Sequence, residues 1–193
     1  VMTAASVLTQ MIRLHQIICG HVKTDDGEVK SIKSNRVKEL LEVLEETNGK
    51  VIIWAVYRYD IQEIEKTLGE KYGKESVATY YGDTKDSIRQ SIVDRFMDAD
   101  DDLRFFVGNP KTGGYGLTLT SSHTVVYYSN DYSLEVRLQS EDRAHRIGQT
   151  NKVTYVDLMA DHTIDEKIVK ALNAKIDLAS QVMGEDPKKI LFG

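Results

Sequence analysis

Residues 139–149 of the chain read QSEDRAHRIGQ. Read as a helix, this stretch places Gln139, Arg143 and Arg146 on one face, because side chains three or four residues apart lie above one another. Ser133 would cap the start of such a helix. Two guanidinium groups one turn apart repel each other, so this face suits a polyanion better than a packed core. A solvated or salt-bridged surface is the competing interpretation, since helices with two arginines are common.

The composition limits the class of protein. With 193 residues the chain is long enough for one domain with its own hydrophobic core. The single cysteine, Cys19, excludes an internal disulfide and is typical of a reducing compartment. No stretch approaches the roughly 20 consecutive apolar residues of a membrane span, so we expect no membrane partner. A net charge of −5 opposes the binding of nucleic acid, so any contact with DNA must use a local basic strip.

Strand and helix patterns alternate along the chain from residue 50 onward. Residues 51–56 are apolar and rich in β-branched side chains, as expected for a strand covered on both faces. Further strand-like runs follow at 77–81, 103–107, 124–128 and 153–158, and helical periodicity separates most of them. This alternation predicts an α/β fold with a mostly parallel central sheet flanked by helices.

The same patterns divide the chain into three segments. Residues 1–34 predict a helical lead-in and linker, because apolar residues recur there at helical spacing. Residues 35–160 hold the alternating units and form the main lobe. Residues 161–193 begin with a capping-box sequence and predict a C-terminal helix and tail that pack back on the lobe.

A glycine-rich loop follows the strand predicted at 103–107. The glycines at 113, 114 and 116 would let the backbone approach a ligand closely. Lys111 and Thr112 can both donate hydrogen bonds to a phosphate. In an open α/β sheet, ligands collect at the carboxyl ends of the strands, where this loop would lie. A purely structural turn is the other interpretation of the loop.

Three motifs, in order along the chain, resemble those of the Swi/Snf-type family of DNA-dependent ATPases, which are helicase-like proteins of superfamily 2. Residues 139–149 resemble the family's last helicase motif. Residues 108–119 resemble its fifth motif, although Asn109 and Pro110 replace the usual pair and Thr118 replaces the usual Asn. Residues 81–84 resemble the stretch between the fourth and fifth motifs. The resemblance implies a RecA-like three-layer domain, the C-terminal lobe of such an ATPase.

This resemblance also implies roles for particular residues. Arg143 and Arg146 would reach the γ-phosphate of ATP as arginine fingers, and Gln139 would help the coupling. Gly114 and Gly116 would lie near the nucleotide. The residues expected to follow the phosphates of one DNA strand are Tyr57, Arg58, Thr84, Asn109, Lys111 and Thr112. Thr84 could equally well be a helix cap. Tyr57 and Arg58 could equally well be ordinary polar residues of a loop.

Two motifs of a complete ATPase are missing from the sequence. It has neither a Gly-x-x-x-x-Gly-Lys-Ser/Thr loop nor an Asp-Glu-x-His box. The resemblance therefore implies that the ligands of ATP and Mg²⁺ lie mainly on an N-terminal RecA-like lobe of the same polypeptide. No metal site is expected in this chain, because its histidines lack metal-ligand spacing. We expect this chain alone to be inactive.

The complete protein would then move along double-stranded DNA as an ATP-dependent translocase or remodeller. It would work in the cytoplasm of a prokaryotic or phage-infected cell, or in the nucleus of a eukaryote. One alternative is a strand-separating helicase of the same superfamily, although the ending His-Arg-Ile-Gly-Gln argues against it, because those helicases more usually have Gly-Arg there. The other is a non-enzymatic α/β binding module whose arginines dock an acidic protein.

Overall fold

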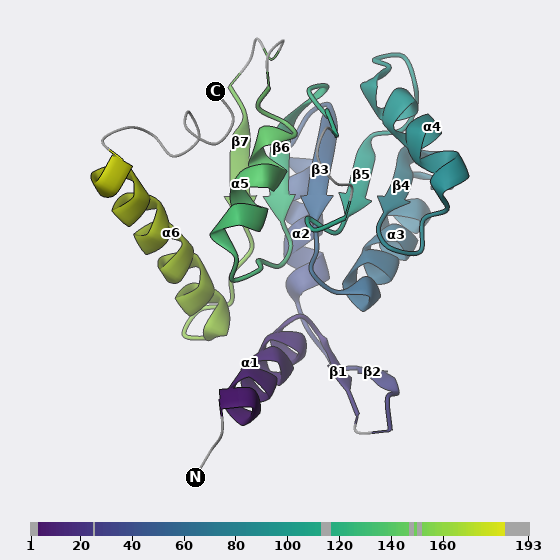
Figure 1. Cartoon of the computed structure of the whole chain (residues 1–193). Helices are drawn as coiled ribbons and strands as arrows, with labels where there is room; N and C mark the ends of the chain where they lie inside the picture. Colours follow the sequence, from purple (N-terminus) through teal and green to yellow (C-terminus); the bar gives the residue numbers. More distant parts are fainter. Residues whose placement is uncertain (1–3, 25, 113–116, 147–148, 150–151, 184–193) are drawn as a thin grey trace.

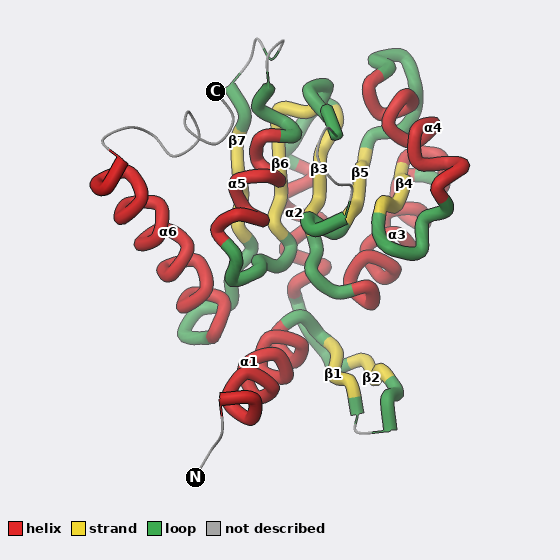
Figure 2. Tube along the Cα trace, in the orientation of Figure 1, coloured by secondary structure: helices red, strands yellow, loops and turns green. Residues whose placement is uncertain are grey.

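We describe the fold in a computed structural model of the chain, which describes residues 4–24, 26–112, 117–146, 149 and 152–183. At its centre lies a sheet of five parallel strands in the order β4-β5-β3-β6-β7 (Figures 1 and 2). The strands are β3 (Lys50–Trp54), β4 (Val77–Tyr80), β5 (Phe105–Gly108), β6 (Ser122–Tyr127) and β7 (Thr154–Asp157). Each strand overlaps one of the predicted runs, and the predicted α/β fold is confirmed.

The central strand β3 sends its side chains alternately into two hydrophobic cores. Val51 and Ile53 point to the core under α2 (Arg36–Glu45) and α3 (Arg58–Tyr72). Ile52 and Trp54 point to the opposite core, under α4 (Asp86–Met97). Helix α5 (Leu134–Asp142) lies on this second side, in front of β6 and β7 in Figure 1. Helices therefore cover both faces of the sheet, which gives the three layers predicted from the sequence.

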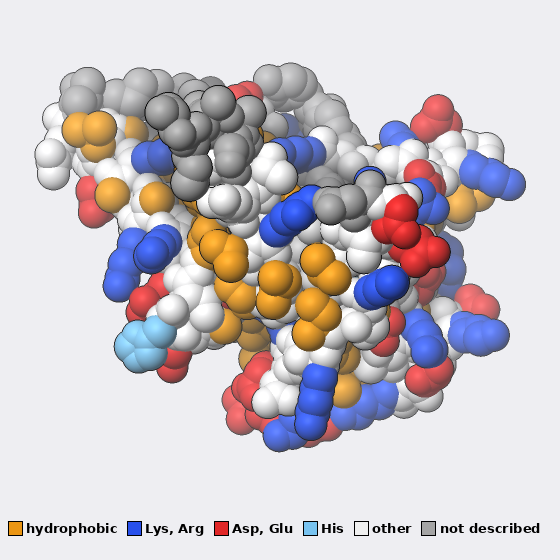
Figure 3. Space-filling view, turned by 90° about the horizontal axis from the view of Figure 1, so that it is seen from below, with side chains coloured by type: hydrophobic (Ala, Val, Ile, Leu, Met, Phe, Trp, Pro, Cys, Tyr) orange, Lys and Arg blue, Asp and Glu red, His pale blue; other side chains and the backbone are white. Residues whose placement is uncertain are grey.

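Ahead of the sheet, the chain forms helix α1 (Ala4–Ile18) and an antiparallel hairpin of β1 (His21–Lys23) and β2 (Val29–Ser31), below the sheet in Figure 1. The helix agrees with the predicted periodicity. The hairpin was not predicted, because three-residue strands are too short to show an alternating pattern. Leu8, Leu14 and Ile17 of α1 are exposed. Figure 3 views this side of the molecule and shows hydrophobic side chains gathered in the middle of the face.

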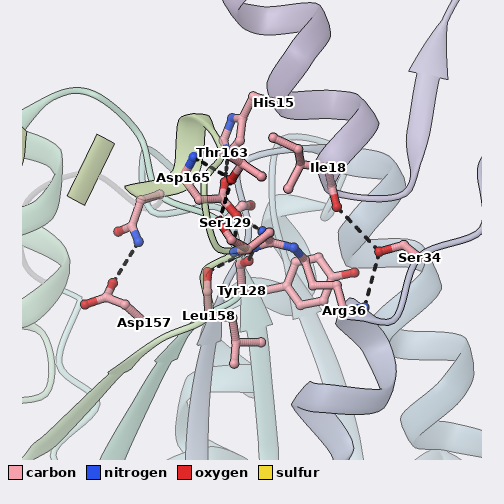
Figure 4. Close-up of polar contacts among 12 residues, drawn as sticks. His15, Ile18, Ser34, Arg36, Tyr128, Ser129, Asp157, Leu158, Thr163 and Asp165 are labelled. Atoms are coloured by element: carbon pink, nitrogen blue, oxygen red, sulfur yellow. Dashed lines mark hydrogen bonds and ion pairs between the residues drawn. The ribbon is translucent and has the colours of Figure 1, made fainter. Parts of the chain in front are cut away.

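The last helix, α6 (Ile164–Met183), is fastened to the sheet at its first turn by a buried ion pair. Arg36, at the start of α2, pairs with Asp165 and donates to the carbonyl oxygens of Tyr128 and Leu158 (Figure 4). Asp165 also lies 3.5 Å from Nε2 of His15 on α1. Burial, together with the Arg36 charge, lowers the pKa of His15 to about 4. His15 is therefore neutral at pH 7, and the positive charge of Arg36 balances the negative charge of Asp165. None of the helices described is long and apolar enough to cross a membrane.

A substitution of Gly108, the last residue of β5, tests how tightly the carboxyl end of the sheet is packed. A Cβ atom at this position would lie 2.8 Å from the carbonyl oxygen of Tyr80 and 2.9 Å from Cζ3 of Trp54. We expect Gly108→Ala to lower the free energy of unfolding by about 1–3 kcal/mol, because a backbone atom cannot move aside cheaply. Gly82→Ala is the matched control, since a Cβ there meets nothing within 4 Å. Equal urea midpoints for the two variants would contradict the packing described here.

Candidate functional site

The carboxyl edge of the sheet brings together the loops that follow β3, β4 and β5, which carry the residues predicted to contact phosphates. Because the strands are parallel, they end side by side, and Trp54 pairs with Gly108 on β5 and Tyr127 on β6. Backbone hydrogen bonds continue the pairing past the strand ends: Ala55 donates to Gly108 at 2.9 Å, and Tyr128 donates to Trp54 at 2.9 Å. Ligands of α/β proteins bind at this edge.

Helix α5 is shorter than the helix predicted for residues 139–149. Its start is as predicted, with the hydroxyl of Ser133 accepting a hydrogen bond from a backbone N–H of the first turn. The helix ends at Asp142, so Gln139 lies on it, whereas Arg143 and Arg146 follow it. The prediction of one helical face carrying all three residues is therefore wrong.

A small buried side chain explains why the chain leaves the helix there. Ala144 is fully buried in the core that also contains Trp54. The carbonyl of Glu141 accepts the N–H groups of both Ala144, at 3.1 Å, and His145, at 3.0 Å. Such sharing tightens the last turn of a helix and redirects the chain. The turn directs Ala144 into the core, which a pattern of charged residues alone does not reveal.

Arg143 is a buried cation with incomplete compensation. It is 5% exposed, and its Cζ lies 5.1 Å from the centre of the Trp54 ring. Its Nη1 has no hydrogen-bond partner among the residues that the structure describes. Burial lowers the pKa of Arg143, although a guanidinium still stays protonated at neutral pH. A buried charged group normally has its hydrogen bonds satisfied, so the unpartnered Nη1 of Arg143 could donate to an anionic ligand.

Arg146 lies near Arg143 in sequence but is exposed. Its Nε is 3.4 Å from a carboxylate oxygen of Asp142, and its Nη1 donates to the hydroxyl of Thr118 at 3.1 Å. Thr118 is one of the three residues that depart from the family's usual motif, and its hydroxyl accepts a hydrogen bond from Arg146. Gln139 is half-buried, and its amide donates to Glu135 at 3.0 Å. These contacts are at the surface, where a stronger anionic ligand can replace them.

Arg137 on α5 shows what a fully compensated arginine looks like in the same region. Its guanidinium donates to Glu141 at 2.6 Å, to Asn130 at 2.8 Å and to Asp157 at 3.2 Å. It also lies 3.6 Å from the centre of the Tyr127 ring. Arg137 therefore fixes α5 to β6 and β7, and it was not predicted as a site residue. Glu141 lies one helical turn away in sequence, but only the tertiary structure brings Asn130 and Asp157 to the same guanidinium.

Three residues predicted to contact nucleic acid have side chains held within the protein. The hydroxyl of Tyr57 lies 3.0 Å from Nδ1 of His15, and burial raises the pKa of Tyr57. The buried hydroxyl of Thr84 donates to the carbonyl of Thr79 at 3.1 Å, and the amide of Asn109 donates to the carbonyl of Val56 at 2.8 Å. In this conformation the three side chains shape the loops and do not project from them. Thr84 does not cap α4 either, whose N-cap is Lys85 without a side-chain bond.

The other predicted contact residues lie nearer the surface. Arg58 pairs with Asp83 at 2.5 Å, and Lys111 pairs with Asp131 at 2.7 Å, with both cations more than half exposed. Thr112 is half-buried, and its N–H donates to the carbonyl of Asn109 at 2.9 Å. The acidic partners of the two cations were not predicted, because such pairing depends on tertiary structure. Gly114 and Gly116 lie outside the described residues.

No group of three or more His, Cys, Asp or Glu side chains in the described ranges could hold a metal ion. Among the described residues, the buried Arg143 lies against Trp54 at the end of β3, and Lys111 is an exposed cation of the loop after β5. Arg146 is an exposed cation beside Thr118, in the segment that leads into the start of β6.

Comparison with known protein families identifies the class of the chain. Residues 32–148 match the model of the helicase conserved C-terminal domain, and the chain belongs to this family. The predicted RecA-like lobe of a Swi/Snf-type ATPase is confirmed by this match and by the relatives described next.

The chain is 31% identical over 185 residues to the ATP-dependent helicase fft2 of Schizosaccharomyces pombe, covering 95% of this chain and 14% of that protein. It is 36% identical over 102 residues to the SWI/SNF chromatin-remodeling complex subunit snf22 of the same organism, covering 53% of this chain and 6% of that protein. The solved C-terminal part of the Fun30 ATPase domain superposes with a TM-score of 0.65 and 26% identity, over 72% of this chain and 46% of that one. The chain therefore spans a small part of these curated relatives.

The same substitution should change the free energy of unfolding very differently at Arg137 and at Arg143. Arg137→Met leaves Asp157 and Glu141 without their cation, so we expect it to lower the free energy of unfolding by about 3–5 kcal/mol. Arg143→Met removes a desolvated charge with an unpaired donor, so we expect stability within about 1 kcal/mol of the wild type, or higher. Urea unfolding of both variants measures this. A large loss for Arg143→Met would mean that the side chain is structural.

Proposed function

We propose that the chain is the second motor lobe of an ATP-dependent translocase or remodeller of double-stranded DNA. The observation that carries the proposal is Arg143: a guanidinium buried against Trp54 with Nη1 unpartnered among the described residues. In a site of low dielectric, a fixed cation stabilises developing negative charge without reorganisation. ATP, bound with Mg²⁺ mainly by the first lobe, would supply the phosphoryl group on which that charge develops.

In this proposal the two arginines act differently. Arg143 is already fixed over Trp54 and would meet the γ-phosphate as the lobes close. Arg146 would exchange its surface contacts with Asp142 and Thr118 for phosphate oxygens. Gln139 would help couple closure to movement, and Gly114 and Gly116 would lie near the nucleotide. We infer that this chain alone has no ATPase activity, because the P-loop lysine and the magnesium carboxylates belong to the first lobe.

DNA would lie along the exposed cations of the carboxyl edge. Arg58 and Lys111 are the side chains free enough to reach phosphates, once they exchange Asp83 and Asp131 for the backbone of DNA. Thr112 would add a contact beside Lys111, and Tyr57, Thr84 and Asn109 would support the loops. Such contacts carry no sequence information, which suits a motor that moves along any duplex. The protein would work where the genome is, which in a eukaryote is the nucleus.

The first test is made on the intact ATPase with both lobes. Arg146→Ala should lower DNA-stimulated kcat by about 10³-fold or more, because arginine-finger interactions strengthen in the transition state. Arg146→Lys should restore little, since an ammonium lacks the bidentate fork. Arg95→Ala is the control, because Arg95 is an arginine on α4 of similar exposure that pairs with Asp101. An unchanged kcat with a lowered melting temperature for Arg146→Ala would sink the proposal.

The second test concerns DNA binding by the 193-residue chain. Lys111→Ala should weaken binding to unrelated duplexes equally and reduce the salt slope by about 1, because one phosphate contact is lost. Asp131→Asn should strengthen binding, because it frees Lys111 and removes a negative charge that faces the DNA. Lys71→Ala is the control, since Lys71 pairs with Glu45 at the far ends of α2 and α3. Base-specific losses in a binding titration would contradict the proposed phosphate contact.

A further inference from the structure

Gln149 lies where the arginine-bearing segment, residues 143–149, returns to the sheet. Its side-chain Nε2 is 3.0 Å from the carbonyl oxygen of Thr120, 3.2 Å from that of Ser122 and 3.3 Å from that of Ala144. Its backbone N–H donates to the carbonyl of Arg146 at 2.9 Å. Gln149 thus bonds to the backbone of Arg146 and ties the turn at residues 143–146 to the segment 118–122.

Two further hydrogen bonds join the same two segments. The N–H of Leu119 donates to the carbonyl of Arg143 at 2.8 Å, and Nη1 of Arg146 donates to the hydroxyl of Thr118 at 3.1 Å. Segment 118–122 is itself fixed to the central strand, because the hydroxyl of Ser122 donates to the carbonyl of Lys50 at 2.9 Å. These few hydrogen bonds therefore fix the position of the arginine-bearing segment relative to β3.

The described part of the arginine-bearing segment needs such bonds because it has no regular structure of its own. Helix α5 stops at Asp142, and the residues described after it form turns and bends. The three carbonyl oxygens around the Gln149 amide are hydrogen-bond acceptors and need a donor. An amide NH₂ group supplies two hydrogens without a charge, whereas a glutamate of the same shape supplies none when ionised.

We infer that Gln149 is a positioning residue for Arg146, and through the same turn for Arg143. It would touch neither the nucleotide nor DNA, and would act by fixing the place from which the arginines reach the transferred phosphoryl group. The inference rests on the proposed function, because it assigns Gln149 a part in the same reaction. It adds that the segment after the glycine-rich loop and the arginine-bearing segment behave as one unit.

The test is a double-mutant cycle in the intact ATPase. Gln149→Met keeps the length of the side chain and removes its donors. We expect it to lower kcat by about 100-fold with little change in KM for ATP, as misplacing a reacting group by about 1 Å does. In an Arg146→Ala background, the same substitution should have an effect about tenfold smaller, because the group it positions is gone. Gln90→Met is the control, an exposed glutamine on α4 that donates to Asp94 at 2.8 Å.

The cycle separates the two ideas. If Arg146→Ala lowers kcat but Gln149→Met costs the same in both backgrounds, Gln149 acts elsewhere and the positioning role is overturned while the proposed function stands. An unchanged kcat for Gln149→Met overturns the inference as well. If Arg146→Ala itself leaves kcat unchanged, the proposed function is overturned, and so is the role of Gln149 in that reaction.

A readout independent of activity comes from Trp54, which is the only tryptophan of the 193-residue chain and lies under Arg143. Displacing the turn moves a cation relative to the indole, so Gln149→Met should shift the emission maximum while thermal unfolding stays cooperative. Gln90→Met should leave the emission unchanged. If Gln149→Met does not fold, Gln149→Glu keeps the shape of the side chain, cannot donate when ionised, and should shift the emission likewise. Unchanged emission in a folded variant would overturn the inference.

Discussion

Strand β3 is held between β5 and β6, and all three run in the same direction. This single constraint places the ends of the strands at one edge, so loops that are distant in sequence become neighbours there. It also divides β3 between two cores, with Ile53 facing one and Trp54 the other. Trp54 is the last residue of the strand, and Arg143 lies against its buried ring.

The two buried arginines near α5 show how the same side chain can serve structure or chemistry. Arg137 meets carboxylates and an amide around its guanidinium, so its burial is compensated within the fold. Arg143 is buried somewhat more deeply than Arg137, but its Nη1 has no partner in the described part of the chain. A protein keeps such a costly arrangement where a ligand completes it, and strained or unsatisfied groups cluster at functional sites for this reason. Exposure alone would not distinguish the two residues, whereas their partners do.

The parts of the fold that were predictable are those encoded locally. The apolar run at 51–56 predicted β3 because a strand covered on both faces needs no alternation, and Ser133 predicted the start of α5 because its cap bond is three residues away. The end of α5 was not predictable, because it depends on burying Ala144 beside Trp54. The inward-facing hydroxyl of Thr84 and the pairing of Lys111 with Asp131 depend on distant segments too. Their sequence motifs showed which loops matter but not which way each side chain points.

The Arg36–Asp165 pair bears on how the lobe would carry a mechanical load. The ends of α1, α2 and α6 meet at this pair, which is shielded from water. Under tension, dispersion contacts are lost one at a time. Separating the two buried charges leaves both of them uncompensated at once, so we expect this contact to break in a single step. A pull on α6 is therefore passed to the sheet with little stretch at the joint. In the proposed motor, a joint of this kind would make α6 turn together with the sheet.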